Sequence, residues 1–379
     1  MFFKQSTSEK KIINNYGFNP ESLSVKKITE TKHFILYQIL PYKNDVFVDK
    51  NKKPVLLIPP YVFGPDILCF IPQKNRSLVH AYANKCFPTY LRVLKDIESN
   101  CSVQNMRAED DIIGTQKCLE KIKELHSKKI TLVGVSQGGT CALYAVLSGK
   151  IDGLIDALST IVTPITLVRE KKNHVFKLLR NIYISFIYIK DAVVLIFRFL
   201  KRYNNGNWVI NKTFSSWLIN KKKSMVLNFS KDLFSSDKEY TIPGKSAVDL
   251  VDTWLTNSAS DIPIKMARFG YCTYIKPVLE DGTLVVKVFD RKLNFKYINK
   301  LGIKYQICIC KDDHIVKRED ALIPCNFVDA EVTEFPKGHM AIMTTWSNPS
   351  SEYSVDKRFG DRKQYRGPVR FHMDLDEEA

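Results

Sequence analysis

Metal-binding and disulfide patterns are missing from this sequence. Its 379 residues include nine cysteines, and none of them stands in C-x-x-C spacing, so a zinc site is not expected. An odd number of cysteines without a secretory start is typical of reduced intracellular thiols. The sequence therefore predicts no metal ion, and nothing in it calls for an organic cofactor.

A signal peptide and a clear membrane span are also missing. The first residues, MFFKQSTSEKK, contain no apolar stretch of the length that export by a signal peptide needs. Residues 181–200 (NIYISFIYIKDAVVLIFRFL) approach the length of a bilayer span. Lys190 and Asp191 stand at the middle of that segment, where each charge costs a few kcal/mol in lipid. We expect a cytoplasmic protein, and association with a granule or membrane stays open.

Acidic residues are scarce relative to basic ones. The chain has 40 Asp and Glu against 57 Lys and Arg, which gives a formal net charge of +17. Such an excess favours a phosphate-bearing ligand, an anionic membrane surface or nucleic acid. No RNP, zinc-finger or helix-turn-helix signature accompanies the basic residues, so nucleic acid is not expected as a partner. A lysine-rich solvated surface is the alternative.

Short buried runs and one helical pattern predict an α/β domain. Runs closed by prolines or glycines are typical of buried parallel strands, and acids in the first turn favour a helix start. The expected strands are residues 33–40, 54–60, 130–135, 304–310 and 331–335, and the expected helices are residues 109–126 and 140–147.

Two parts of the chain depart from this alternation. Aromatics, Asn and Lys crowd together between residues 169 and 260, which predicts an inserted cap or lid. The chain turns polar and charged near its end, which predicts a flexible tail. The predicted organisation is an N-terminal arm at 1–30, a first core part at 31–168, the cap at 169–260, a second core part at 261–346 and the tail at 347–379.

The segment Gly134-Val135-Ser136-Gln137-Gly138-Gly139 contains a candidate nucleophile. It matches G-x-S-x-G at the end of a predicted strand and the start of a predicted helix. In this nucleophile elbow the turn is so tight that the flanking positions must be small, and the serine is lifted above the sheet edge. We predict an α/β-hydrolase fold, with a mostly parallel sheet and an inserted helical cap, in which Ser136 is the nucleophile. A Gly-rich turn without chemical function is the alternative.

A serine nucleophile needs a general base and an acid that orients it, in the chain order Ser, Asp or Glu, His. Asp313 and His339 each follow one of the last two predicted strands. We predict His339 as the base and Asp313 as the acid. Asp312 is the alternative acid, and His314 and His372 are the alternative bases.

The oxyanion hole is expected to use two backbone amides. One donor should be the N–H of Gln137, the residue after the nucleophile, and the other should come from the loop after residues 54–60. Pro59 and Pro60 have no N–H, so the second donor is Tyr61 or a later residue. Val62 is our prediction and Tyr61 the alternative. The loop could also cross the sheet edge without touching substrate.

Substrate contacts are expected from the cap and from this loop. Basic residues of the cap precede the bulky apolar residues 182–200, so one segment could meet phosphate and acyl chain together. We predict a lid helix there, with an ordinary buried helix as the alternative. The predicted substrate-binding residues are Tyr61, Lys171 and Lys172.

Four segments together resemble the polyhydroxyalkanoate synthases. They are residues 54–70 (PVLLIPPYVFGPDILCF), the double-glycine elbow with residues 161–165 (IVTPI), residues 313–316 (DHIV), and Gly338-His339. The resemblance implies an α/β-hydrolase core with a cap, and a triad that falls on Ser136, Asp313 and His339. The family normally carries Cys as its nucleophile, and it has Pro where this chain has Lys317.

The resemblance and the residues together predict a function. We expect a synthase-like acyltransferase or hydrolase that acts on hydroxyacyl thioesters, such as hydroxyacyl-CoA, or on hydroxyacyl esters. A weakly active or non-catalytic homologue that binds polyester granules or anionic membrane surfaces is the alternative. Polymer synthesis and hydrolysis both stay open, as do a homodimer and a partner subunit.

Overall fold

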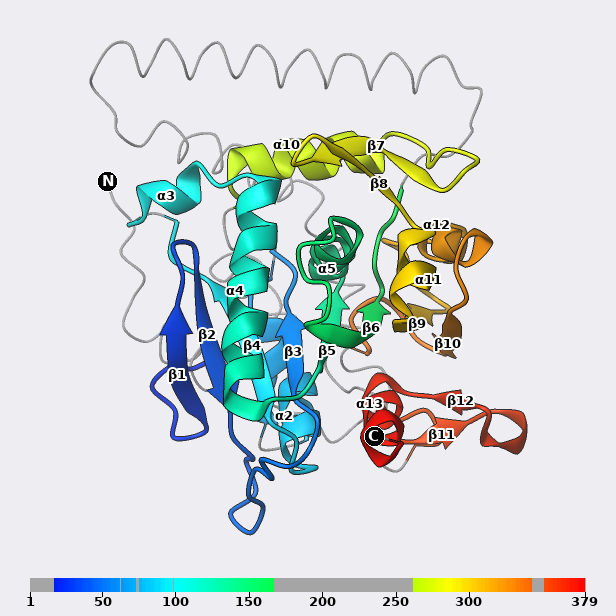
Figure 1. Cartoon of the computed structure of the whole chain (residues 1–379). Helices are drawn as coiled ribbons and strands as arrows, with labels where there is room; N and C mark the ends of the chain where they lie inside the picture. The colour runs from blue at the N-terminus through cyan, green and yellow to red at the C-terminus, as the bar shows by residue number, and fades with distance from the viewer. Residues whose placement is uncertain are drawn as a thin grey trace.

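The central feature of the fold is an eight-stranded sheet with the strand order β1-β2-β4-β3-β5-β6-β9-β10. The computed structural model describes residues 17–61, 63–72, 75–97, 99–166, 262–342 and 351–378. β1, β2 and β4 pair antiparallel, and every pairing from β4 through β3, β5, β6 and β9 to β10 is parallel (Figure 1). This mostly parallel sheet confirms the predicted α/β class.

The strands of this sheet are short. They are β1 (Val25–Glu30), β2 (Phe34–Ile39), β3 (Val55–Ile58), β4 (Thr89–Leu94), β5 (Ile130–Val135), β6 (Ile155–Ile161), β9 (Lys304–Cys310) and β10 (Glu331–Phe335). Two small antiparallel pairs complete the described strands: β7 (Thr283–Val288) with β8 (Arg291–Asn294), and β11 (Arg358–Phe359) with β12 (Tyr365–Arg366).

The described helices are α2 (Leu78–Ala83), α3 (Cys101–Gln104), α4 (Ala108–His126), α5 (Gln137–Leu147), α10 (Ile264–Tyr274), α11 (Tyr297–Leu301), α12 (Arg318–Ala321) and α13 (Pro368–Glu377). Three short 3-10 helices accompany them: η1 (Asp66–Cys69), η3 (Ile323–Asn326) and η4 (Asp361–Lys363). Within the described ranges, no helix is long and apolar enough to cross a membrane.

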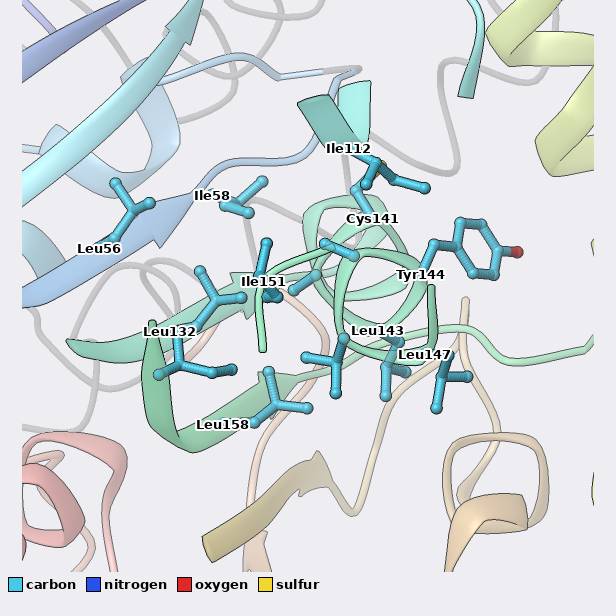
Figure 2. Close-up of a cluster of buried hydrophobic side chains, with 14 of the residues drawn as sticks. Leu56, Ile58, Ile112, Leu132, Cys141, Leu143, Tyr144, Leu147, Ile151 and Leu158 are labelled. Carbon is cyan, nitrogen blue, oxygen red and sulfur yellow. The ribbon is translucent and has the colours of Figure 1, made fainter. Parts of the chain in front are cut away.

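The sheet is buried on both faces because its central strands are apolar on both sides. In β5, Ile130 and Leu132 pack in one cluster with α4 and α5, whereas Val133 and Val135 pack in a second cluster with α2 and α13. Successive strand residues point to opposite faces, so an unbroken apolar run fills two layers. Figure 2 shows the first layer, where side chains of β3, β5 and β6 pack against α5. The strand that leads to Ser136 is therefore fixed from both sides.

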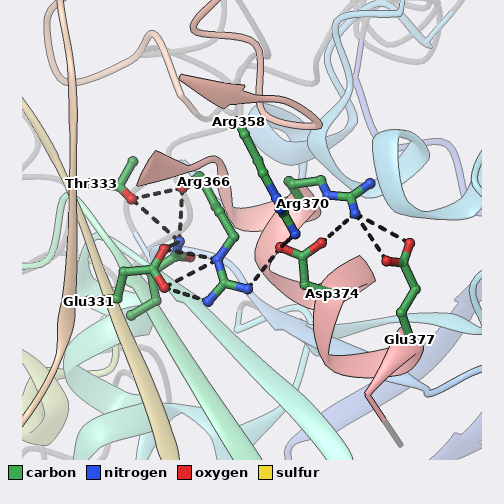
Figure 3. A network of polar contacts seen from close by, with 8 residues as sticks. Glu331, Thr333, Arg358, Arg366, Arg370, Asp374 and Glu377 are labelled. Atoms are coloured by element: carbon green, nitrogen blue, oxygen red, sulfur yellow. Dashed lines mark hydrogen bonds and ion pairs between the residues drawn. The ribbon is translucent and has the colours of Figure 1, made fainter. Parts of the chain in front are cut away.

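The C-terminal residues form a folded part of the molecule. Arg366 bonds to Glu331 of β10 at 2.5 Å and to Asp374 of α13 at 2.8 Å (Figure 3). The buried residues of α13 are Pro368, Val369, Phe371, His372 and Asp374. The predicted flexible tail is wrong for residues 351–378, because the charges that suggested solvation pair with one another and the apolar residues between them are buried.

The N-terminal arm and the cap are the other two predicted parts of the chain outside the core. The predicted N-terminal arm at 1–30 includes β1, which pairs with β2, so the arm is wrong for the residues of that strand. The predicted cap at 169–260, with its lid helix, lies outside the described residues, which resume at residue 262.

Candidate active site

Ser136 lies in a strained turn between β5 and α5. Its backbone has φ 50° and ψ −119°, a conformation that non-glycine residues rarely adopt and that is found at functional turns. A Cβ on Gly134 would lie 2.5 Å from the Cα of Gly139, and one on Gly138 would lie 2.2 Å from the carbonyl oxygen of Ile58. Glycine is required at both positions by this packing. The turn has the geometry of a nucleophile elbow.

The Ser136 hydroxyl faces an imidazole. Ser136 is the N-cap residue of α5 but makes no side-chain capping bond. Its Oγ lies 3.2 Å from Nε2 of His339. Nδ1 of His339 lies 2.7 Å from Oδ2 of Asp313. When Nδ1 carries the ring proton and donates a hydrogen bond to the carboxylate, Nε2 is free of a proton and can accept the serine proton.

Two loops at the carboxyl edge of the sheet carry the acid and the base. Asp313 follows β9 and His339 follows β10, which are neighbouring parallel strands. Oδ1 of Asp313 accepts the backbone N–H groups of Ile315 and Val316, both at 2.8 Å. The loops are joined by the N–H of Asp312, which donates to the carbonyl of Lys337. The carboxylate therefore has one oxygen fixed by the backbone and the other directed at the imidazole.

The acid and the base are shielded from water. The side chains of His339 and Asp313 are 2% and 3% exposed. Ser136 itself is partly exposed, so a substrate carbonyl can reach it. A charge that forms on the imidazole is attracted more strongly by the carboxylate in such a site than it would be in water.

The structure separates the alternative acids and bases. Asp313 contacts His339, whereas Asp312 is exposed. His372 is fully buried in α13, where its ring nitrogens contact the hydroxyl of Thr131 and the carbonyl of Lys53. Burial lowers the pKa of His372 to about 3, so it stays neutral. His314 is exposed, and the imidazole that contacts the Ser136 hydroxyl is that of His339.

The expected oxyanion donors are described only in part. Gln137 is the first residue of α5 and follows Ser136 directly. The carbonyls of Ile58 and Pro59 lie against Gly138, so the end of β3 abuts the first turn of α5. Val62 lies outside the described residues, and its role stays a prediction.

Tyr61 differs from its prediction as a substrate-binding side chain. The side chain is 7% exposed and belongs to the cluster around α4 and α5. Its hydroxyl donates to the carboxylate of Asp111. The predicted substrate contact is wrong for this phenol, because its polar atom is bound inside the core. Lys171 and Lys172 lie outside the described residues, so their contacts stay predictions.

Sequence patterns missed one group of buried polar residues near the elbow. Arg92 of β4 and Asp111 of α4 form an ion pair whose side chains are both 2% exposed. In the sequence, Asp111 is one of several acids in a first helical turn, which the helix dipole alone would explain. An arginine within a strand was the available signal, because a strand buried on both faces has no place for an unpaired charge.

Within the described ranges, no group of three or more His, Cys, Asp and Glu side chains is arranged to hold a metal ion. The polar chemistry of the candidate site rests on Ser136, His339 and Asp313. Their chain order, the elbow between β5 and α5, and the mostly parallel sheet make this an α/β-hydrolase fold, as the sequence predicted.

Comparison with known proteins adds distant structural neighbours. No protein-family model matches the sequence, and no curated protein matches it. The naproxen esterase of Bacillus subtilis is 11% identical and covers 90% of this chain and 95% of its own, with a TM-score of 0.45. A carboxylesterase structure from Nitrososphaera is 14% identical and covers 84% and 92%, with a TM-score of 0.43. The thioesterase domain of the curacin biosynthetic pathway is 10% identical and covers 85% and 95%, with a TM-score of 0.42.

Proposed function

We propose that this protein is a serine-dependent acyl hydrolase or acyltransferase. The observation that carries the proposal is the unbroken contact from Ser136 to His339, at 3.2 Å, and from His339 to Asp313, at 2.7 Å. The nucleophile stands on a strained elbow, and the base is held by a carboxylate that two backbone amides fix in place. This is the arrangement that acyl transfer through a serine requires.

The reaction follows from these contacts. Oγ of Ser136 attacks the acyl carbonyl carbon while Nε2 of His339 takes the hydroxyl proton. The carboxylate of Asp313 stabilises the imidazolium, and backbone amides at the start of α5 and after β3 bind the oxyanion. Nε2 then gives the proton to the departing alcohol or thiol, which leaves an acyl ester on Ser136. Water or a hydroxyl acceptor then gives its proton to Nε2 and attacks the acyl carbon; the bond to Oγ of Ser136 breaks, and Nε2 returns the proton to that oxygen.

We propose hydroxyacyl thioesters or esters as the acyl donors. The support is the likeness of four segments to polyhydroxyalkanoate synthases, which spans both the elbow and the triad positions. The identity of the nucleophile bears on whether the acyl group is hydrolysed or passed on to another acceptor. A thiolate is a better leaving group than an alkoxide, so a Cys enzyme can pass its acyl group on by exchange. An oxygen ester on Ser136 is resolved by water in ordinary esterases, which favours hydrolysis over chain growth.

We also propose that the basic residues bring the protein to an anionic amphiphilic surface, a membrane or a polyester granule. The net charge of +17 and the basic and apolar residues of 169–200 support this. Each basic residue near anionic headgroups adds about 1 kcal/mol. We expect salt-sensitive cosedimentation with anionic liposomes, and weaker binding when Lys171 and Lys172 are both changed to Glu. Binding that is equal on neutral and anionic liposomes would remove the electrostatic part.

The proposed activity is tested by incubating the protein with 3-hydroxybutyryl-CoA. Free thiol and polymer are measured separately. We expect thiol release without polymer in the wild type and no thiol release above background in Ser136→Ala. Ser99→Ala, which removes an exposed hydroxyl, is the control and should match the wild type. Polymer as the main product would contradict the hydrolytic direction, and full turnover by Ser136→Ala would contradict the nucleophile.

A further inference from the structure

A buried cluster brings together residues of β2, β4, α4, α5 and the turn after β3. Arg92 of β4 and Asp111 of α4 form a bidentate ion pair. Nη1 donates to Oδ1 and Nη2 donates to Oδ2, both at 3.0 Å. The guanidinium lies 4.1 Å from the ring centre of Phe34, on β2. Tyr61, in the turn after β3, donates its hydroxyl to the same carboxylate. Cys141 of α5 is buried in the same cluster as Phe34 and Tyr61.

Stability alone does not explain this ion pair. Taking two charges out of water costs several kcal/mol per ion, and apolar residues of similar volume often serve a core as well or better. What a buried, hydrogen-bonded ion pair provides is a fixed position for each of its atoms. The carboxylate of Asp111, held at both oxygens by Arg92, is therefore a rigid acceptor for the Tyr61 hydroxyl.

Tyr61 connects this rigid acceptor to the backbone beside the elbow. Pro59 and Pro60 cannot donate a backbone hydrogen bond, so the first N–H after β3 belongs to Tyr61 itself. Burial and the charge of Asp111 raise the pKa of Tyr61 well above its usual value. The phenol therefore keeps its proton and donates it in the hydrogen bond to Asp111. The side chain of one residue fixes the first backbone amide of the turn.

The turn after β3 and the first turn of α5 touch each other and the same cluster. The carbonyls of Ile58 and Pro59 lie where a Cβ on Gly138 would stand, so the two backbones are in direct contact. Further along α5, Cys141 is buried in the same cluster as Tyr61 and Phe34. The two backbone segments that could supply oxyanion donors are therefore both packed against the part of the core that holds the Asp111 carboxylate.

We propose that Tyr61 is a positioning residue, which acts through Asp111 and Arg92 to hold the turn after β3 at the distance from Ser136 that a two-donor oxyanion hole requires. The inference rests on the proposed function of Ser136. Oxyanion donors act on the charge that develops in the transition state, and they contribute little to ground-state binding. Loss of the Tyr61–Asp111 hydrogen bond therefore loosens one oxyanion donor and slows the chemical step. Substrate binding and the position of His339 stay unchanged.

The test compares Tyr61→Phe with Tyr90→Phe. Tyr90 lies on β4 and is 1% exposed, and its hydroxyl contacts Nε2 of His126, at the end of α4 remote from Asp111. Each variant loses one phenol hydrogen bond, which is buried at Tyr61 and part-buried at Tyr90. Hydrolysis of p-nitrophenyl butyrate gives kcat and KM over a range of pH, inhibition by an aryl trifluoromethyl ketone reports binding of a tetrahedral oxyanion, and thermal unfolding reports stability.

We expect Tyr61→Phe to lower kcat by about ten- to a hundredfold, less than the hundred- to thousandfold that follows removal of an oxyanion donor. The ketone should bind more weakly by a similar factor, with KM and the midpoint of the pH profile unchanged. Tyr90→Phe should keep the wild-type kcat. An unchanged kcat in Tyr61→Phe, or an equal loss in both variants, would overturn the inference while the wild type stays active. A wild type that neither hydrolyses the ester nor binds the ketone would overturn the proposed function together with it.

Discussion

Gly138→Ala tests whether the elbow is as tight as its packing indicates. The new Cβ would lie 2.2 Å from the carbonyl oxygen of Ile58 and 2.6 Å from that of Pro59. Both obstacles are backbone atoms, one of them in a central strand, so neither can swing aside as a side chain could. Overpacking of this kind costs about 3 kcal/mol, the upper part of its usual range.

Gly138→Ala should lower both the stability and the activity of the protein. At about 2 °C per kcal/mol for a chain of this size, the melting temperature should fall by about 6 °C. A shift of the elbow by about 1 Å should also slow acylation of Ser136 by about a hundredfold. Differential scanning fluorimetry and hydrolysis of p-nitrophenyl butyrate measure the two effects.

Gly270→Ala is the matched control. Gly270 lies within α10, and the nearest atom to its new Cβ would be Cε2 of Tyr274 at 3.6 Å, an ordinary contact. Replacing a glycine inside a helix should stabilise the protein by about 1 kcal/mol. The two variants should therefore move the melting temperature in opposite directions. Gly138→Ala with the melting temperature and activity of the wild type would refute the packing argument.

Three further changes have expected outcomes. Ser136→Cys should raise the ratio of transfer to hydrolysis when an alcohol acceptor competes with water for a thioester donor, and an unchanged ratio would count against the role assigned to the oxygen ester. Burial lowers the pKa of His372 to about 3, so the unfolded chain binds more protons than the folded one between that value and about 6.5. Urea unfolding should therefore show stability that rises with increasing pH across that window, by up to about 1.4 kcal/mol per pH unit, and a smaller rise in His372→Gln. Arg366→Met removes the arginine that pairs with Glu331 and one of the three arginines that pair with Asp374 (Figure 3), and it should lower the free energy of unfolding by about 2 kcal/mol. Arg318→Met, at an exposed ion pair, should cost less than about 1 kcal/mol.

Sequence patterns predicted three strands with the right bounds. They are β5, which is buried throughout, β9, which is buried after its first residue, and β10, which is partly buried. β1 was missed because its sequence, VKKITE, is that of an edge strand with a solvated face. β4 was missed because Arg92 interrupts its apolar pattern, and that arginine is paired with Asp111 on another element.

The candidate site, too, could be predicted from the sequence only in part. Ser136, Asp313 and His339 could be picked from the sequence because each follows a predicted strand, and the ends of parallel strands meet at one edge of a sheet. The structure brings these three together. Tyr61 was predicted to face the substrate, and its hydroxyl instead bonds to Asp111, which is 50 positions away in the chain. Such a contact depends on how α4 packs on the sheet, which no local pattern shows.

The measurement that tests the account most directly is covalent labelling by a fluorophosphonate, followed by peptide mapping. Such reagents form a phosphonate ester with a serine, with loss of fluoride, only when a base activates that serine. We expect a single adduct on Ser136, no adduct in Ser136→Ala, and labelling slowed by about a thousandfold or more in His339→Ala and Asp313→Asn. Absence of labelling in the folded wild type, or a His339→Ala variant that labels as fast as the wild type, would contradict the triad.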